Sequence, residues 1–351
     1  MSLPPIRTSR RLVEPLWGGT RLASWLGLPE PHPASLGESW QVYGSNLIVG
    51  GPYAGQSLAD LAAQHGPELV GLRTVARYGV DFPLLAKFLD ASDHLSIQVH
   101  PDDAYAQRYE AHTGFYGKTE AWYILDAAPG ANVIYGLNRA CSREEFAHAV
   151  AHGSVEKLMA YLPVQPGDLI FVPPGTFHAI NAGIMLFEIQ QKSDLTYRVY
   201  DYGRHDQRTG RPRELHLDRA LEVGRFAPLP DGRRSALQLD RGRDLLVACH
   251  SFALERRQLT EPVTLQTDPG SFEIWTLIDG DVELIWGREQ TLLTRGDSLV
   301  LPASLGRYTL RSARPAILLN AYVPHLELLA AEAHRCGADS NQISQVIIQE
   351  W

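Results

Sequence analysis

The chain of 351 residues has little cysteine, and its three cysteines, Cys141, Cys249 and Cys336, lie far apart. An odd number of widely spaced cysteines predicts neither a disulfide framework nor a thiolate metal site. The sequence also lacks any run of about 18 apolar residues, and no positively charged segment leads into an apolar one after Met1. We therefore expect neither a membrane span nor a signal peptide, and we expect the protein to be cytoplasmic.

An excess of positive charge is also absent, because the formal net charge is -8. This charge argues against nucleic acid or an anionic membrane surface as the partner, although a few local cations can still hold a phosphorylated small molecule. The hydrophobic content of 44% and charged content of 21% are those of an ordinary globular protein. A chain of this length can bury a large core, and it predicts two domains.

Short apolar runs bounded by Gly, Pro and Asp dominate the chain and predict the strands of a sandwich or barrel. The clearest runs are 95–100, 121–125, 168–172, 184–189, 271–278, 282–286 and 298–301. Helical patterns are fewer and predict helices over 57–64, 142–152, 154–161 and 326–334. Ser142, with Glu145 three residues later, predicts a capped helix N-terminus.

A weak internal repeat relates two parts of the chain. Residues 120–125 resemble 273–278, and the Gly-Asp turn, apolar strand and Pro of 166–173 resemble 295–302, about 130 residues further on. This Gly-Asp, strand and Pro pattern resembles that of the cupins, which implies jelly-roll barrels. The expected fold class is all-β dominated, with two cupin-type jelly-roll barrels and a few peripheral helices.

Three short segments carry the residues of one candidate metal site. Gln98 and His100 stand two apart in an expected strand, so their side chains face the same side. Glu120 follows Gly-Lys-Thr, and His178 ends the segment Pro-Pro-Gly-Thr-Phe-His. Two imidazoles, one carboxylate and one amide oxygen are typical of a catalytic zinc ion, one per chain, with room left for water or substrate.

The two repeats differ at the metal position, because eleven residues after the Gly stands His178 in the first and Arg307 in the second. We therefore expect residues 1–225 to form an N-terminal metal-binding cupin barrel with helical inserts. Residues 226–325 are expected to form a degenerate C-terminal barrel with a structural or substrate-shaping role, and 326–351 a helical tail.

Two cations and one acid are candidates for the chemistry. Lys118 precedes Glu120 by two residues, so in a strand both would face the pocket, where Lys118 could bind phosphate or move a proton. Arg198 could stabilise negative charge or orient the substrate. Asp194 could orient Arg198 or share in proton transfer. Each of them alone is more often an ordinary surface charge, so these roles stay open.

With these residues in place, the chain resembles the type I mannose-6-phosphate isomerases (phosphomannose isomerases) in their short form. The matching segments are 17–19, 37–40, 95–103, 117–123, 173–180, 188–191 and 193–202. The resemblance covers about the first 200 residues well and the second barrel only by general pattern. It implies Gln98, His100, Glu120 and His178 as zinc ligands. It also implies that Lys118, Asp194 and Arg198 lie beside the substrate.

The activity implied is a zinc-dependent aldose–ketose isomerisation that interconverts mannose 6-phosphate and fructose 6-phosphate through an enediol. One alternative is a non-catalytic cupin that binds a sugar phosphate. Another is a cupin metalloenzyme that acts on another aldose. A third is a cupin oxygenase, because two His and one carboxylate also bind Fe(II), although the fourth ligand Gln98 and the nearby cations argue against it.

Overall fold

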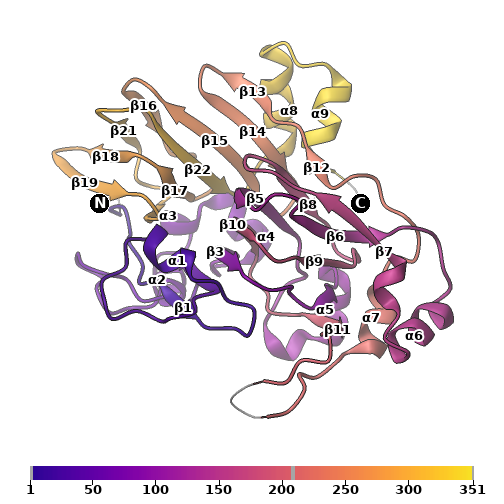
Figure 1. Ribbon diagram of the computed structural model, residues 1–351. Helices are drawn as coiled ribbons and strands as arrows, with labels where there is room; N and C mark the ends of the chain where they lie inside the picture. Colours follow the sequence, from indigo (N-terminus) through magenta and orange to yellow (C-terminus); the bar gives the residue numbers. More distant parts are fainter. Residues whose placement is uncertain (1–2, 207–209, 350–351) are drawn as a thin grey trace.

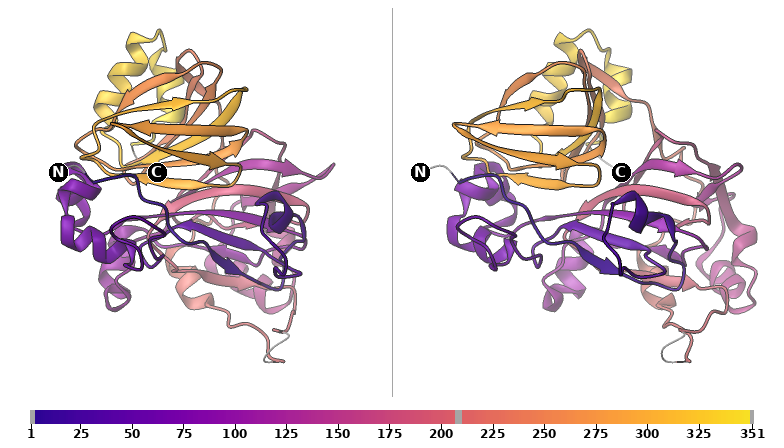
Figure 2. Two further views of the ribbon diagram at one scale, coloured as in Figure 1. Left: turned by 90° about the vertical axis from the view of Figure 1, so that its left-hand side faces the viewer. Right: turned by 60° about the vertical axis from the view of Figure 1, so that its left-hand side comes forward.

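The computed structural model describes residues 3–206 and 210–349. Its strands form four sheets whose ladders are antiparallel, and these sheets make two barrels that lie against each other (Figures 1 and 2). The helices are short and lie at the periphery. The prediction of an all-β-dominated fold with two barrels and a few peripheral helices is confirmed.

The first barrel joins a seven-stranded sheet to a five-stranded sheet. The larger sheet contains, in spatial order, β1 (Arg11–Val13), β2 (Glu38–Val42), β3 (Leu84–Ala91), β10 (Ile184–Gln191), β5 (Glu120–Ala127), β8 (Leu169–Val172) and β12 (Arg233–Arg234). The smaller sheet contains β11 (Tyr197–Tyr200), β4 (Ile97–Val99), β9 (His178–Ile180), β6 (Asn132–Leu137) and β7 (Met159–Pro163). Buried side chains that include Trp122, Ile124 and Leu186 form an apolar core inside it.

The second barrel joins a six-stranded sheet to a four-stranded sheet. The larger sheet contains β13 (Leu237–Asp240), β14 (Arg243–Ala248), β15 (Ala253–Leu259), β22 (Ala316–Tyr322), β17 (Glu273–Asp279) and β20 (Ser298–Leu301). The smaller sheet contains β16 (Val263–Gln266), β21 (Arg307–Arg311), β18 (Asp281–Trp286) and β19 (Glu289–Thr294). Leu277, Leu284 and Leu310 belong to its own apolar core.

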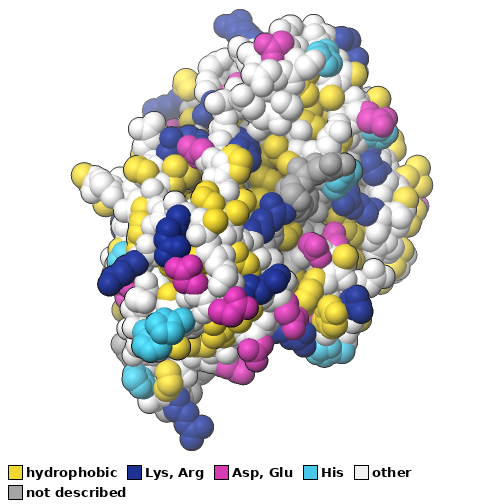
Figure 3. All heavy atoms as spheres, turned by 90° about the vertical axis from the view of Figure 1, so that its right-hand side faces the viewer, with side chains coloured by type: hydrophobic (Ala, Val, Ile, Leu, Met, Phe, Trp, Pro, Cys, Tyr) yellow, Lys and Arg dark blue, Asp and Glu magenta, His cyan; other side chains and the backbone are white. Residues whose placement is uncertain are grey.

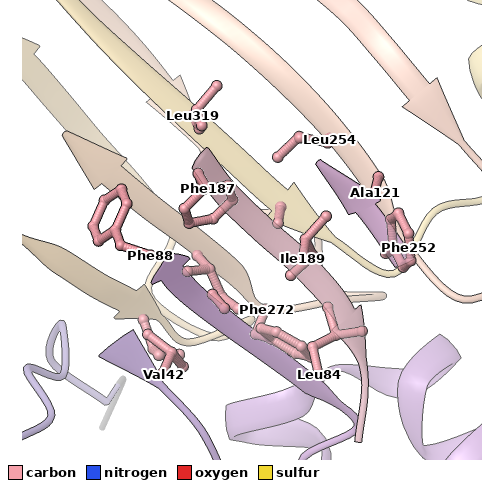
Figure 4. Close-up of a cluster of buried hydrophobic side chains, with 14 of the residues drawn as sticks. Val42, Leu84, Phe88, Ala121, Phe187, Ile189, Phe252, Leu254, Phe272 and Leu319 are labelled. Atoms are coloured by element: carbon pink, nitrogen blue, oxygen red, sulfur yellow. The ribbon is translucent and has the colours of Figure 1, made fainter. Parts of the chain in front are cut away.

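The two large sheets share an apolar layer where the barrels meet. Figure 4 shows Phe88 and Phe187 of the first barrel near Leu319 of the second, and all three belong to one buried cluster. Side chains alternate between the two faces of a strand, so Glu188, the residue after Phe187 on β10, points away from this layer and into the first barrel. β10 thus contributes to the shared apolar layer with one face and supplies a polar residue to the interior of the first barrel with the other.

The described residues contain nine α-helices and two short 3-10 helices. They are α1 (Arg21–Trp25), α2 (Leu58–His65), α3 (Pro67–Val70), α4 (Leu72–Tyr78), α5 (Asp103–Tyr109), η1 (Ala111–Thr113), α6 (Arg143–Ala151), η2 (Val155–Leu158), α7 (Leu217–Val223), α8 (Leu326–Arg335) and α9 (Ser340–Val346). The helices predicted over 57–64, 142–152 and 326–334 are present as α2, α6 and α8. The predicted cap at Ser142 is also present, because its side chain accepts a hydrogen bond from the Glu145 backbone N–H.

The helix predicted over 154–161 is wrong. Only the 3-10 turn η2 forms there, and from Met159 onward the chain continues as β7. β7 pairs with β6, with Tyr161 opposite Ile134, so a sheet ladder satisfies the backbone groups that a helix would have bonded internally. Tertiary pairing overrides the local apolar spacing in this segment.

Some features bear on the expected boundaries of the two barrels. β12 pairs with β8 of the first barrel, and α8 and α9 pack on the second barrel beside β13 and β14 (Figure 1). The division at residues 225 and 325 stays a prediction.

In the described ranges, no helix is long and apolar enough to cross a membrane. On the face shown in Figure 3, the basic and acidic side chains of the described residues are interspersed.

Candidate metal centre

The structure brings three predicted ligands together inside the first barrel. His100 directly follows β4, Glu120 opens β5, and His178 opens β9. All three side chains are buried, and one ligand atom from each lies within 4.8 Å of the others. Glu120 Oε1 is 3.2 Å from His178 Nε2, and Glu120 Oε2 is 3.6 Å from His100 Nε2. The three donors therefore surround one point.

Backbone carbonyls orient both imidazoles. His100 Nδ1 lies 2.8 Å from the Leu195 carbonyl oxygen, and His178 Nδ1 lies 2.8 Å from the Thr176 carbonyl oxygen. A carbonyl only accepts hydrogen bonds, so each Nδ1 donates, and the Nε2 of each ring is left as the atom that can bind a metal ion. Burial and the Lys118 ammonium hold the pKa of His100 well below its usual value, which keeps that ring neutral. This donor set fits a divalent metal ion.

Gln98 lies beside this group. It stands opposite His178 in the pairing of β4 with β9, and its amide nitrogen is 3.4 Å from His178 Nε2. Rotation about the last side-chain bond exchanges the amide nitrogen and oxygen, so the same position can present an oxygen ligand. Gln98 therefore lies next to the three donors, and its role as a fourth ligand stays a prediction.

Lys118 also contacts the candidate ligands, although it precedes β5 and is not part of the strand. Its Nζ lies 2.5 Å from Glu120 Oε2 and 3.0 Å from His100 Nε2. Burial by itself would raise the pKa of Glu120, but the Lys118 ammonium holds this pKa well below its usual value. Glu120 is therefore an ionised carboxylate, as a metal ligand must be.

Arg198 lies on β11 directly opposite Gln98. Its Nε donates to the Ser96 hydroxyl at 3.2 Å, and its Nη1 donates to the Glu214 carbonyl oxygen at 3.0 Å. Burial and the neighbouring Arg213 lower the pKa of Arg198. Within the described ranges, Arg198 forms no ion pair with a carboxylate, so the groups that orient it are Ser96 and a backbone carbonyl.

Asp194 is exposed and lines the same cavity as Arg198. Among the residues that the structure describes, the two side chains are not hydrogen-bonded to each other. The structure thus places Asp194 at the cavity, where its charge acts on Arg198 without a direct hydrogen bond, and a role in orienting Arg198 stays a prediction.

Two of the candidate ligands, Gln98 and Glu120, line a cavity of about 160 Å3 together with Lys118 and Arg198. Lys87 and Glu188, to which the sequence analysis gave no role, line it as well. Lys87 Nζ lies 3.4 Å from a carboxylate oxygen of both Glu38 and Glu188, and Lys118 Nζ lies 3.8 Å from Glu188. Burial raises the pKa of Glu188 to about 7, although Lys87 and Lys118 oppose this shift.

A signal for the two missed residues was present in the sequence. Lys87 is the only cation in the apolar run that forms β3, and Glu188 is the only charged residue in the run that forms β10. A charged residue that is nearly fully buried requires a partner or a function. The sequence does not reveal that these two strands are neighbours, and so the pairing of Lys87 with Glu188 could not be foreseen.

Comparison with known protein families agrees with this geometry. The family described as "Phosphomannose isomerase type I, catalytic domain" matches residues 7–121. The family described as "Mannose-6-phosphate isomerase, cupin domain" matches residues 243–319. The two matches fall in the first and the second barrel respectively.

Individual relatives match over nearly the whole chain. The mannose-6-phosphate isomerase of Streptococcus mutans is 35% identical over 338 residues, which are 95% of this chain and 99% of that protein. The mannose-6-phosphate isomerase ManA of Bacillus subtilis is 36% identical over 326 residues, which are 91% of this chain and 99% of that protein.

Solved structures extend the comparison to the fold. The crystal structure of the Bacillus subtilis mannose 6-phosphate isomerase superposes with a TM-score of 0.80 at 34% identity, covering 90% of this chain and 99% of that one. A mutant of the phosphomannose isomerase of Salmonella typhimurium, at 15% identity and a TM-score of 0.75, shares the fold over 91% of this chain and 99% of that one. By sequence identity across both barrels, the chain belongs to the type I phosphomannose isomerase family.

Proposed function

We propose that this protein is a zinc-dependent isomerase that interconverts mannose 6-phosphate and fructose 6-phosphate. The observation that carries the proposal is the buried group of His100, Glu120 and His178 at a cavity lined by cations, in a chain of this family. The metal is proposed to be zinc because nitrogen and oxygen donors with room for a substrate are typical of catalytic zinc. Gln98 would be the fourth protein ligand.

The reaction moves two protons and needs no redox step by the protein. A proton leaves C2 of mannose 6-phosphate and returns to C1, while a second proton passes from O2 to O1 by way of an enediol. A divalent metal ion supplies Lewis-acid stabilisation of the negative charge that develops on these oxygens. The protein must hold the substrate, stabilise this charge and carry the protons.

Lys118 is proposed to hydrogen-bond to the substrate oxygens or to exchange protons with them. Its ammonium contacts atoms of Glu120 and His100 that would hold a metal ion, so a bound ion would displace the ammonium from them. Once released, it can donate a hydrogen bond to a substrate oxygen or carry a proton. Asp194 lines the exposed part of the same cavity and is a second candidate for proton transfer.

Arg198 is proposed to bind the anionic part of the substrate. The charge of Lys87 is shared with Glu38 and Glu188, whereas Arg198 has only neutral acceptors, Ser96 and the Glu214 carbonyl, among its described contacts. Its remaining N–H groups are therefore available for a phosphate or an enediolate, both of which guanidinium binds well.

Elemental analysis combined with a coupled mannose 6-phosphate isomerase assay, before and after chelation, tests this function. We expect about one zinc per chain, turnover that chelation abolishes, and recovery when zinc is returned. Bound metal and bound sugar phosphate without turnover would instead support a sugar-phosphate-binding cupin. Iron-dependent oxygen uptake would support an oxygenase, and a protein that binds no metal would contradict the four-ligand site.

A further inference from the structure

The second barrel contains a cavity of about 560 Å3, which is larger than the cavity at the candidate metal centre. It lies where β15, β17 and β22 open towards α8, the helix that covers this end of the barrel in Figure 1. The volume is within the range of about 300–1,000 Å3 that is usual for small-molecule sites. Neither the candidate metal ligands nor the cations of the first cavity, Lys87, Lys118, Arg198 and Arg213, line it.

The interior of this barrel changes from apolar to polar along the strands that reach the cavity. On β15 the inward-facing Leu259 belongs to the apolar core, whereas Arg257, two residues earlier, lines the cavity. β22 repeats the change from Leu318 to Asn320. Small barrels are normally filled by apolar side chains, so packing alone does not account for polar residues at these positions.

Some of the polar side chains in the cavity already have strong partners. Glu255 accepts hydrogen bonds from Arg243 Nε at 2.7 Å and from the Tyr322 hydroxyl at 2.6 Å. Glu273 accepts from Trp275 Nε1 at 2.7 Å and from the Tyr308 hydroxyl at 2.5 Å. These carboxylates are satisfied within the protein and need no ligand.

Arg257 and Asn320 differ from these carboxylates. Arg257 is only 7% exposed, and in the described ranges its guanidinium has one ion pair, to Asp240 at 3.9 Å, and no hydrogen bond. Asn320 is also 7% exposed, and its buried Oδ1 has no hydrogen-bond partner among the described residues. Burying a cation and an amide without hydrogen bonds costs free energy in a folded protein. A ligand that forms hydrogen bonds with both side chains would offset this cost.

We propose that this cavity is a second ligand site, and that its ligand is a small hydroxylated anion, a phosphorylated or carboxylated sugar. Arg257 binds the phosphate or carboxylate, and Asn320 Oδ1 accepts a hydrogen bond from a hydroxyl group. Trp275 and Leu328 of α8 supply apolar walls to the same cavity. The site is separate from the isomerase centre and does not depend on the function proposed for it.

Isothermal titration calorimetry of the full chain with glucose 6-phosphate and with gluconate tests this site. We compare the wild type with Arg257→Gln and Asn320→Leu, and we use Arg241→Gln as the matched control, because Arg241 lies on the same barrel, is 88% exposed and does not line the cavity. Both cavity variants should bind the probe at least about tenfold more weakly, and the control should bind it like the wild type. Isomerase turnover and the melting temperature show whether each variant is folded.

The two probes also distinguish the source of the anion. Loss of glucose 6-phosphate binding alone in the cavity variants assigns the site to phosphate, and loss of gluconate binding assigns it to carboxylate. Binding that persists in both cavity variants and disappears in Lys118→Ala belongs to the first barrel and overturns the proposal. A folded wild type that binds neither probe overturns it as well.

Discussion

At the scale of single residues, the candidate metal centre depends on groups that are not ligands. The Leu195 and Thr176 carbonyls fix which nitrogen of His100 and of His178 faces Glu120. Such outer contacts set the tautomer and the ring orientation before any ion binds. The centre is therefore organised by backbone positions, and a ligand can be replaced without disturbing the segments that hold its neighbours.

The first residue-scale prediction concerns His178→Ala. The change removes one donor, so we expect loss of the bound zinc and a fall in turnover of at least about 100-fold. The fold should persist, because the barrel keeps an apolar core that includes Trp122 and Ile124. Metal content, kcat/KM and the melting temperature measure these outcomes. His152→Ala, at an exposed histidine, is the control, and full activity in His178→Ala would remove this residue from the ligand set.

Arg198→Ala should keep its bound zinc, in contrast to His178→Ala. Arg198 contacts Ser96 and the Glu214 carbonyl and none of the three buried donors, so the variant should keep its zinc. Turnover should fall by about 10- to 1,000-fold because a fixed cation near the developing charge is lost. Arg198→Lys should recover only part of it, since an ammonium lacks the planar fork of a guanidinium. Metal analysis beside steady-state kinetics checks this, and loss of zinc in Arg198→Ala would show a structural role.

At the scale of elements, β17 shows how one strand combines a core with a polar cavity. Leu277 and Trp275 belong to the apolar core of the second barrel, and Glu273 at the start of the strand lines the cavity. In the first barrel, β5 begins in the same way with Glu120. In β5 the acid lies among metal donors, whereas in β17 it accepts hydrogen bonds from Trp275 and Tyr308. The repeat preserves the element and changes the partners of its first residue.

Glu273 on β17 leads to a prediction about how the stability of the fold depends on pH. Burial raises the pKa of Glu273 from 4.5 to about 7, although Tyr308 and Trp275 oppose the shift. The folded protein therefore holds the proton of Glu273 more tightly than the unfolded chain does. The stabilisation from this protonated carboxyl is fully present below about pH 4.5 and is lost as the pH rises through about 7. Glu273→Gln cannot ionise. Relative to wild type, this variant should gain about 2–3 kcal/mol between pH 5 and pH 8.

Urea midpoints of the wild type and Glu273→Gln at four pH values across this range measure the effect. Glu289→Gln, at an exposed position of the same barrel, is the matched control. Parallel pH profiles for the wild type and Glu273→Gln would show that Glu273 ionises alike in the folded and unfolded states.

At the scale of the whole molecule, local sequence patterns predicted the residues of the candidate metal site. Features that depend on the pairing of strands distant in the sequence were not predicted. His100, Glu120 and His178 could be found because each stands in a recognisable local segment. Lys87 and Glu188 were missed because their meaning arises only when β3 and β10 pair, with Lys87 opposite Glu188. The helix predicted over 154–161 failed for a similar reason, since the partner strand β6 lies outside that segment.

The shared apolar layer gives the last prediction, which concerns both barrels at once. Phe187 packs against Phe88 with ring centroids 5.5 Å apart, and its buried cluster includes Leu319 of the second barrel. Truncation in Phe187→Ala should cost about 3–5 kcal/mol of unfolding free energy, because it leaves a cavity between the two large sheets. The barrels should still unfold together, since each loses part of the same core. Urea unfolding followed by circular dichroism and by tryptophan fluorescence measures this, with Leu292→Ala at an exposed position as the control. Two separate transitions, with the second barrel as stable as before, would show that the barrels do not share a common core.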